Sequence, residues 1–279
     1  MITSINAINS LKYTNYKVNN ISQSINLQES SRNVDELNNL AKMNRMHISF
    51  SGIQKVEKNF PKHKLENYSG CMLGGAIGDA LGNPVEYDKY EKIRERYGNK
   101  GVTDLLLIKG EAQITEDTQL SIFTADGIIK SSIKHGNDNK MPDMRDVYDS
   151  YQDWLSTQKG RFEPTKKGWI SNVENLHHRR ESGLLCIPFL ESKMPGSIEF
   201  PINNSKNADG VLRTAPVGLR YYKNPELAFE AGARCVALTH GSPSAYLPAG
   251  MLSALIANII QGKDMQTAVD DSLKILKKI

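Results

Sequence analysis

The 279-residue chain is long enough for one large hydrophobic core or two small ones, and its 39% hydrophobic and 24% charged residues are typical of a soluble globular protein. Its net charge of +4 is modest and its basic residues are spread along the chain, which argues against a nucleic-acid-binding stripe. Because it lacks 18 consecutive apolar residues, a signal peptide and an even number of cysteines, we expect a cytoplasmic protein with reduced thiols and no membrane span.

Residues 1–60 have a different composition from the rest of the chain. They are rich in Asn and Ser and show no sustained hydrophobic periodicity, which is typical of a flexible leader. A weak helical pattern over residues 34–46 could dock on the body of the protein. The segment is either a mobile extension or a leader for a specialised secretion system. We therefore divide the chain into a leader, residues 1–60, and a domain, residues 61–279.

Helical periodicity predominates from residue 65 onward, so we predict an all-α domain. The first predicted helix, residues 65–81, places glycines at every fourth position along one face (Gly70, Gly74, Gly78 and Gly82). Each glycine disfavours a helix by about 1 kcal/mol, so this face indicates close approach of another helix or of a ligand.

The later helices follow from apolar residues at helical spacing. We predict them over residues 115–134, 144–158, 225–238, 248–260 and 269–278, with Pro225 and Pro248 in first turns. Only residues 102–108 resemble a strand. The long loops of residues 83–114 and 160–216 are where we expect a ligand to bind.

The segment Thr115-Glu116-Asp117-Thr118 places two adjacent carboxylates between two hydroxyls at a predicted helix start. In one reading Thr115 is the N-cap and the carboxylates occupy the first turn. In the other, these oxygens bind magnesium, a hard ion that takes oxygen ligands. Asp79 needs a hydrogen bond, an ion pair or a metal if it is buried, and Glu86 is either an exposed loop residue or part of the same site.

Two segments nearer the C-terminus also carry candidate functional groups. The polar loop of residues 203–210 is either an ordinary turn or a place where backbone N–H groups around Gly210 bind a phosphate. His240 lies between the two most apolar predicted helices, where it either has a structural role or lines a pocket. The sequence has no G-x-S-x-G nucleophile elbow, which disfavours a serine hydrolase.

In this order the motifs resemble the ADP-ribosylglycohydrolase family, over about residues 65–279. They are the glycine-rich helix with Gly78-Asp79 and Glu86, then Thr115 to Thr118, then residues 203–216, then Thr239-His240 and Pro243. The resemblance implies an orthogonal helical bundle with two Mg²⁺ or Mn²⁺ ions in a central cleft. The implied reaction is hydrolysis of the N- or O-glycosidic bond that joins ADP-ribose to a modified protein or small molecule.

The same resemblance implies roles for individual residues. Thr115, Glu116 and Asp117 would be metal ligands, and Asp117 and Glu86 would be catalytic. The implied contacts to ADP-ribose come from four residues (Asn207, Gly210, Arg213 and His240). Asp79 would be structural or would support the metal ligands.

The chain also departs from the family pattern. Glu116 stands where many relatives carry Asp, and Asn207-Ala208-Asp209 replaces a glycine-rich run, which places an acid where it could repel a diphosphate. Relatives carry a second Asp-x-Asp-Ser/Thr metal motif beyond the position of Ile279, and Asp270-Asp271-Ser272 is not its equivalent. We therefore expect an incomplete two-ion site. A catalytically weak or inactive protein that binds ADP-ribose or another protein is the alternative to an active hydrolase, and the oligomeric state stays open.

Overall fold

The computed structural model describes residues 64–136, 140–159, 170, 173–180 and 186–279, and the predicted leader lies outside these residues. The described chain is helical apart from one short antiparallel hairpin, which confirms the all-α prediction. In chain order the elements are α4 (Lys64–Gly82), α5 (Tyr90–Tyr97), β1 (Leu107–Ile108), β2 (Glu111–Ala112), α6 (Glu116–His135), α7 (Met144–Gln158), α8 (Cys186–Glu191), α9 (Ala215–Arg220), α10 (Pro225–Ala237), α11 (Pro243–Ile260) and α12 (Met265–Leu276). Short 3₁₀ turns lie at Asn83–Val85, Glu174–Leu176 and Leu212–Thr214.

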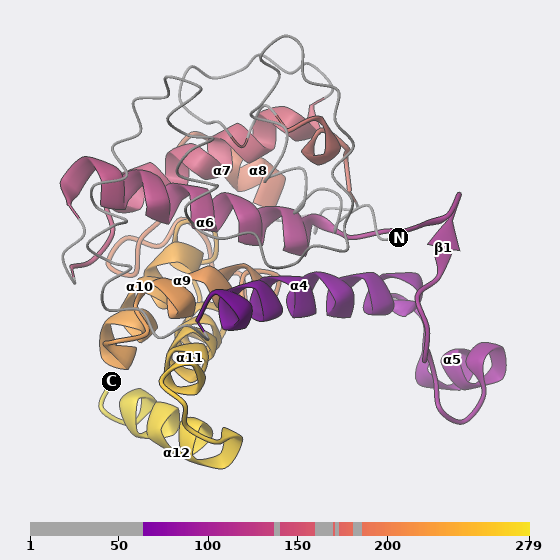
Figure 1. Cartoon of the computed structure of the whole chain (residues 1–279). Helices are drawn as coiled ribbons and strands as arrows, with labels where there is room; N and C mark the ends of the chain where they lie inside the picture. The colour runs from indigo at the N-terminus through magenta and orange to yellow at the C-terminus, as the bar shows by residue number, and fades with distance from the viewer. Residues whose placement is uncertain (1–63, 137–139, 160–169, 171–172, 181–185) are drawn as a thin grey trace, which may run out of the picture.

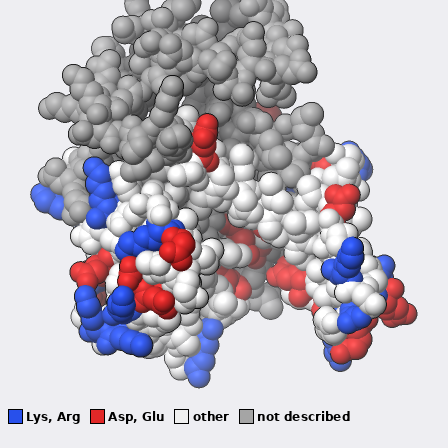
Figure 2. All heavy atoms as spheres, turned by 60° about the horizontal axis from the view of Figure 1, so that its bottom comes forward, with Lys and Arg blue, Asp and Glu red and all other residues white. Residues whose placement is uncertain are grey.

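The helices form two groups, α6 with α7 and α9 with α10, α11 and α12, which contact each other through α6 and α9 (Figure 1). In this view the α6–α7 pair lies above α4, α9 and α10 lie beside one end of α4, and α11 and α12 lie lower. Helix α5 and strand β1 stand at the far end of α4, away from both groups. Figure 2 views the molecule from its lower side and shows Asp and Glu side chains around a hollow in this face.

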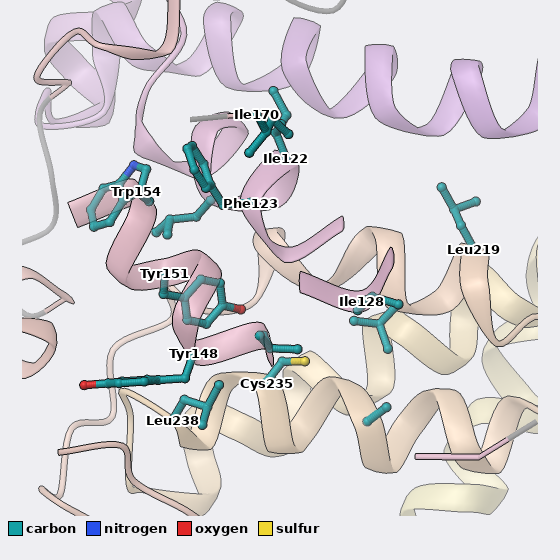
Figure 3. Close-up of a cluster of buried hydrophobic side chains, with 14 of the residues drawn as sticks. Ile122, Phe123, Ile128, Tyr148, Tyr151, Trp154, Ile170, Leu219, Cys235 and Leu238 are labelled. Carbon is teal, nitrogen blue, oxygen red and sulfur yellow. The ribbon is translucent and has the colours of Figure 1, made fainter. Parts of the chain in front are cut away.

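Large aromatic side chains fill the core between α6, α7 and α10 (Figure 3). Tyr151, Trp154 and Phe123 have no exposed surface. The buried indole N–H of Trp154 donates to Gln119 Oε1 at 3.1 Å, so the one polar atom of this ring is satisfied. These side chains place α6 firmly against α7, and α6 begins at the acidic motif.

Several expected elements differ from the structure at their bounds. The sequence predicts that the last strongly apolar helix begins at Pro248. In the structure this helix, α11, begins at Pro243, so Pro248 lies inside it and not in its first turn. Of the strand-like residues 102–108, only Leu107 and Ile108 form a strand. The two predicted loops contain the unpredicted helices α5, α8 and the first residues of α9.

No described helix packs on the glycine-rich face of α4, so of the two expected reasons for these glycines only close approach of a ligand stays open within the described residues. A Cβ atom added at Gly70, Gly74, Gly78 or Gly82 would meet no described atom within 4 Å outside the helix's own backbone and the chain neighbours. All four glycines are exposed. Close approach of a neighbouring helix therefore does not explain them within the described structure.

Helix α11 is the one described helix with the length and apolar composition of a membrane span. It packs against α9, α10 and α12, and Ala249, Ala254 and Ala257 on it are fully buried. Its apolar composition is that of a central helix in the bundle. The cytoplasmic location stays a prediction.

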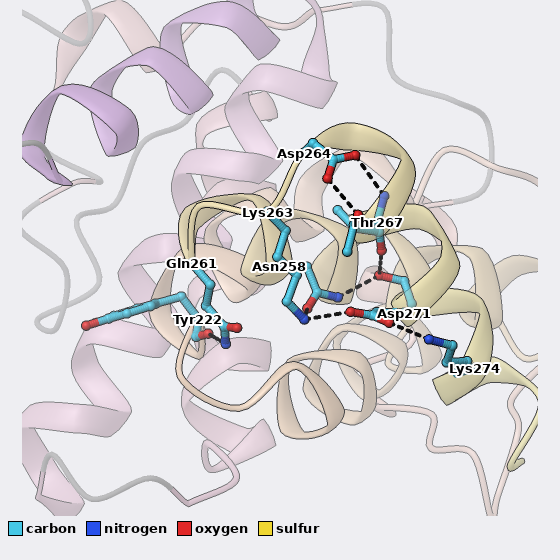
Figure 4. Close-up of polar contacts among 10 residues, drawn as sticks. Tyr222, Asn258, Gln261, Lys263, Asp264, Thr267, Asp271 and Lys274 are labelled. Atoms are coloured by element: carbon cyan, nitrogen blue, oxygen red, sulfur yellow. Dashed lines mark hydrogen bonds and ion pairs between the residues drawn. The ribbon is translucent and has the colours of Figure 1, made fainter.

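Polar contacts connect the end of α11 to α12 (Figure 4). Lys263 Nζ donates to Asn258 Oδ1 and to Asp271 Oδ2, both at 2.8 Å, and Asn258 Nδ2 donates to Ser272 Oγ at 3.0 Å. Hydrogen bonds from Lys263 and Lys274 lower the pKa of Asp271 to about 2. Asp271 and Ser272 thus have a structural role in joining α12 to the end of α11.

Candidate functional site

Two side chains accept hydrogen bonds from the backbone N–H groups at the N-terminus of α6. Thr115 Oγ1 accepts a hydrogen bond from the backbone N–H of Asp117 at 3.2 Å, which confirms the N-cap reading. Asp79 Oδ2 accepts from the backbone N–H groups of Thr115 at 2.9 Å and Thr118 at 3.3 Å, and from Thr118 Oγ1 at 2.5 Å. One carboxylate of α4 therefore satisfies N–H groups that the start of α6 would otherwise leave free.

A pocket of about 190 Å³ opens beside this helix start. Its lining comes from α4, α6, the segment before α9, α9 itself and α11: Cys71, Met72, Gly75, Ala76, Asp79, Asp117, Thr118, Ser121, Ile122, Leu212, Ala215, Leu252 and Ile256. Ser121 Oγ donates to the carbonyl of Leu212 at 3.2 Å and so fixes the segment before α9 against α6. The pocket combines an apolar wall with two carboxylates.

Asp117 is the most perturbed acid in this pocket. Burial, followed by the charges of Asp79, Glu116, Asp209 and Glu86, raises the pKa of Asp117 to about 7. Like charges that share a poorly solvated site disfavour ionisation of one another. The arrangement therefore concentrates negative charge around Asp117, and a cation bound there would offset it.

The other acids of the predicted site differ in their placement. Glu116 is buried but does not line the pocket, and Glu86 is exposed just after the Asn83–Val85 turn. Within the described ranges, the acids around Asp117 form no group of three whose ligand atoms all lie within 4.8 Å of one another. The acidic cluster is thus loosely arranged. Mg²⁺ commonly keeps several waters and needs only one or two carboxylates, so such a cluster fits this ion.

In the loop that the family resemblance links to ADP-ribose, one of the two expected contact residues is exposed and the other is buried. Asn207 is exposed, and its Nδ2 donates to Asp209 Oδ2 at 2.6 Å. Gly210 is buried, and a Cβ atom added there would lie 2.6 Å from Val236 Cγ1 on α10. Close packing on α10 therefore accounts for the glycine, which weakens the reading of Gly210 as a phosphate cradle.

Arg213, for which the family resemblance implies a contact to the substrate, does not reach the surface. Its side chain has no exposed area, and Nη2 donates to Thr239 Oγ1 at 2.6 Å and to the carbonyl of Cys235 at 3.1 Å. The guanidinium carbon lies 4.6 Å from the centre of the Tyr151 ring, a cation–π contact. Arg213 therefore holds α10 and the segment after it against α7.

His240 is likewise buried, and it does not line the pocket beside Asp117. Its Nδ1 lies 2.9 Å from Thr239 Oγ1, and its Nε2 has no hydrogen-bond partner among the residues described. Burial and then the charge of Arg213 lower the pKa of His240 to about 3. The ring is neutral at physiological pH.

Two residues of the site were not assigned these roles from the sequence. Asp209 contributes to the charge around Asp117. Asn203 Oδ1 accepts from the backbone N–H groups of Ser205 at 2.9 Å and Gly241 at 3.0 Å, so it fixes the loop to the segment before α11. The polar composition of residues 203–210 was the available signal for both, but Asp117 and Gly241, with which they interact, lie far away in the sequence.

Comparison of the sequence with known proteins finds one matching family model and a distant relative. Residues 61–279 match the family model described as ADP-ribosylglycohydrolase. An uncharacterized protein of Archaeoglobus fulgidus is 27% identical over 207 residues, which cover 71% of this chain and 58% of that protein. The matched region thus spans less than two thirds of that relative's length. No solved structure matches the chain.

Proposed function

Because the chain belongs to the ADP-ribosylglycohydrolase family, we propose that it cleaves the glycosidic bond between ADP-ribose and a modified protein or small molecule. The pocket beside Asp117 is the proposed site. The observation that carries the proposal is the carboxyl of Asp117, which lines this pocket and has its pKa raised to about 7 among four further carboxyls.

A divalent cation fits the chemistry of this cluster. Hard ions such as Mg²⁺ and Mn²⁺ prefer carboxylate and hydroxyl oxygens, which Thr115, Glu116 and Asp117 all carry. The Thr115 hydroxyl can accept the N-cap hydrogen bond and still offer a second lone pair. We propose these three residues as the cation ligands.

We assign each group in the pocket a separate role in the proposed reaction. A bound cation would supply the positive charge that orients the ribose and activates a water. Cleavage develops positive charge on the ribose, which the carboxylates of Asp117 and Glu86 would stabilise. The apolar side chains of Ile122, Leu252 and Ile256 also line the pocket and would limit access of bulk water to the bound ribose. Asp79 holds the start of α6 in place through its hydrogen bond from the Thr115 backbone N–H.

Release of free ADP-ribose tests the proposal. The substrates are a protein ADP-ribosylated on arginine, a protein ADP-ribosylated on serine, and an ester-linked ADP-ribose, each with Mg²⁺, Mn²⁺ or EDTA. We expect cation-dependent release from at least one substrate and a loss of at least about 100-fold in Asp117→Ala, because an essential side chain commonly accounts for such a factor. Asp270→Ala is the matched control, since Asp270 is an exposed acid on α12.

Binding without turnover is the second candidate. The carboxyl of Asp209 adds negative charge near Asp117, where it would oppose a diphosphate and weaken productive binding. ADP-ribose binding without release from any of the three substrates in either cation would support this candidate. Release that is equal in EDTA, or unchanged in Asp117→Ala, would contradict the proposed site.

A further inference from the structure

Three side chains converge where α6 ends and α7 begins. His135 is the last residue of α6, Asp143 is the N-cap of α7, and Asp146 lies in the first turn of α7. His135 Nε2 lies 3.5 Å from Asp143 Oδ2 and 3.4 Å from Asp146 Oδ2, and three ligand atoms of this group all lie within 4.8 Å of one another. This cluster is about 27 Å along α6 from Asp117, at 1.5 Å per residue.

Each carboxylate uses its other oxygen in a structural contact. Asp143 Oδ1 accepts from the backbone N–H of Arg145 at 2.9 Å, which is the N-cap of α7. Asp146 Oδ1 accepts from Lys134 Nζ at 3.1 Å. The two remaining oxygens are thereby held beside the same imidazole nitrogen, and each offers one lone-pair direction to a shared ligand.

The distances suit a bound ion better than hydrogen bonds. N–H···O hydrogen bonds usually measure about 2.7–3.2 Å, so contacts of 3.4 and 3.5 Å are long. Ligands about 2.0–2.1 Å from a tetrahedral ion are separated from one another by roughly 3.4 Å. The observed spacings therefore leave room for an ion between the three atoms.

Asp146 supplies an independent indication that this cluster binds a ligand. It is only 7% exposed, and no donor in the described part of the chain is in hydrogen-bonding geometry to its Oδ2 atom. A buried carboxylate oxygen without such a partner is costly. This oxygen faces His135, whose side chain is 49% exposed and leaves a path from solvent.

We propose that His135, Asp143 and Asp146 bind a divalent transition-metal ion, with water at a fourth position. One imidazole and two carboxylates form a ligand set that Zn²⁺ accepts in tetrahedral geometry, whereas Mg²⁺ prefers oxygen ligands alone. The ion would join the end of α6 to the start of α7. Its role is structural, and it is separate from the cation proposed at Asp117.

The test is calorimetric titration of the untagged full chain with ZnCl₂ at neutral pH, in excess Mg²⁺ to occupy the oxygen-rich site. We expect one tight Zn²⁺ per chain, bound at least tenfold more weakly in His135→Ala and Asp143→Asn. The asparagine can still cap α7 through its carbonyl oxygen, so this variant removes a ligand without removing the cap. His178→Ala, which removes an exposed histidine outside the cluster, is expected to bind Zn²⁺ like the unmodified chain.

Two further measurements define the ligands and separate this site from the pocket. Co²⁺ in place of Zn²⁺ is expected to give tetrahedral absorption bands without a thiolate charge-transfer band, and Asp117→Ala is expected to keep Zn²⁺ binding. No tight Zn²⁺ binding, or Zn²⁺ binding that His135→Ala leaves unchanged, overturns the proposal. A protonated His135 paired with both aspartates would give the first of these results.

Discussion

Asp79 has more influence on the candidate site than its position outside the acidic motif suggests. One of its oxygens accepts three hydrogen bonds from the start of α6. We expect Asp79→Ala to lower the free energy of unfolding by roughly 1–2 kcal/mol, as for loss of a helix cap, and to weaken Mn²⁺ binding roughly 10- to 100-fold. Asp79→Asn retains an oxygen acceptor and should restore part of both losses. Urea unfolding and Mn²⁺ titration measure the two effects, and equal Mn²⁺ affinity in Asp79→Ala and the unmodified chain would contradict this role.

His240 makes the stability of the fold depend on pH. Its pKa falls from 6.5 to about 3 on folding, so between these values the unfolded chain binds a proton that the folded chain does not. The free energy of unfolding therefore falls as the pH drops below about 6.5, by up to about 1.4 kcal/mol per pH unit from this residue. We expect His240→Gln to flatten that slope in urea unfolding between about pH 6 and pH 5. An unchanged slope would show that His240 does not titrate as its burial implies.

At the scale of single residues, a hydrogen bond between near neighbours in the sequence could be predicted, whereas the burial of individual side chains could not. The N-cap role of Thr115 depends on residues two positions away, and it was visible directly. The enclosure of Arg213 and His240 depends on Tyr151 and Thr239 and on the packing of α7 against α10. For this reason neither side chain lines the pocket beside Asp117, although the family resemblance implies that both contact the substrate.

At the scale of elements, the long amphipathic helices were predictable because their apolar residues repeat at helical spacing. Helix α7 has the predicted bounds, α4 and α6 each differ from their predicted bounds by one residue at both ends, and α10 ends one residue earlier than predicted. Helices α8 and α9 have six residues each, too few for the periodicity to show. The start of α11 was missed because two prolines, Pro243 and Pro248, both offered a first-turn position.

The glycines of α4 and α6 differ in the space around the position of a Cβ atom. Gly74 meets no described atom at its missing Cβ, whereas a Cβ at Gly127 would lie 2.6 Å from Val147 Cα on α7. We expect Gly74→Ala to raise the free energy of unfolding by about 0.5–1 kcal/mol and Gly127→Ala to lower it by roughly 1–3 kcal/mol. Chemical denaturation of the two variants provides the comparison. A destabilised Gly74→Ala variant would mean that this face of α4 is covered.

At the scale of the whole molecule, α6 connects the two proposed cation sites. Its N-terminus carries the acidic cluster around Asp117, and its last residue, His135, belongs to the cluster with α7. The pocket needs α4, α6, α9 and α11 together, so segments far apart in the sequence must fold before it exists. The order of motifs could indicate the family, but the pocket's lining and the charge contribution of Asp209 required the assembled bundle.

Titration of ADP-ribose into the full chain, with Mg²⁺ or with EDTA, tests the central claim that the pocket beside Asp117 binds this ligand through a cation. We predict that Mg²⁺ tightens ADP-ribose binding at least tenfold in the unmodified chain and in Asp270→Ala, and that it has no such effect in Asp117→Asn. The asparagine keeps the size of the side chain while removing the charge that holds the cation. Equal affinity with Mg²⁺ and with EDTA, or a Mg²⁺ effect that persists in Asp117→Asn, would contradict the account.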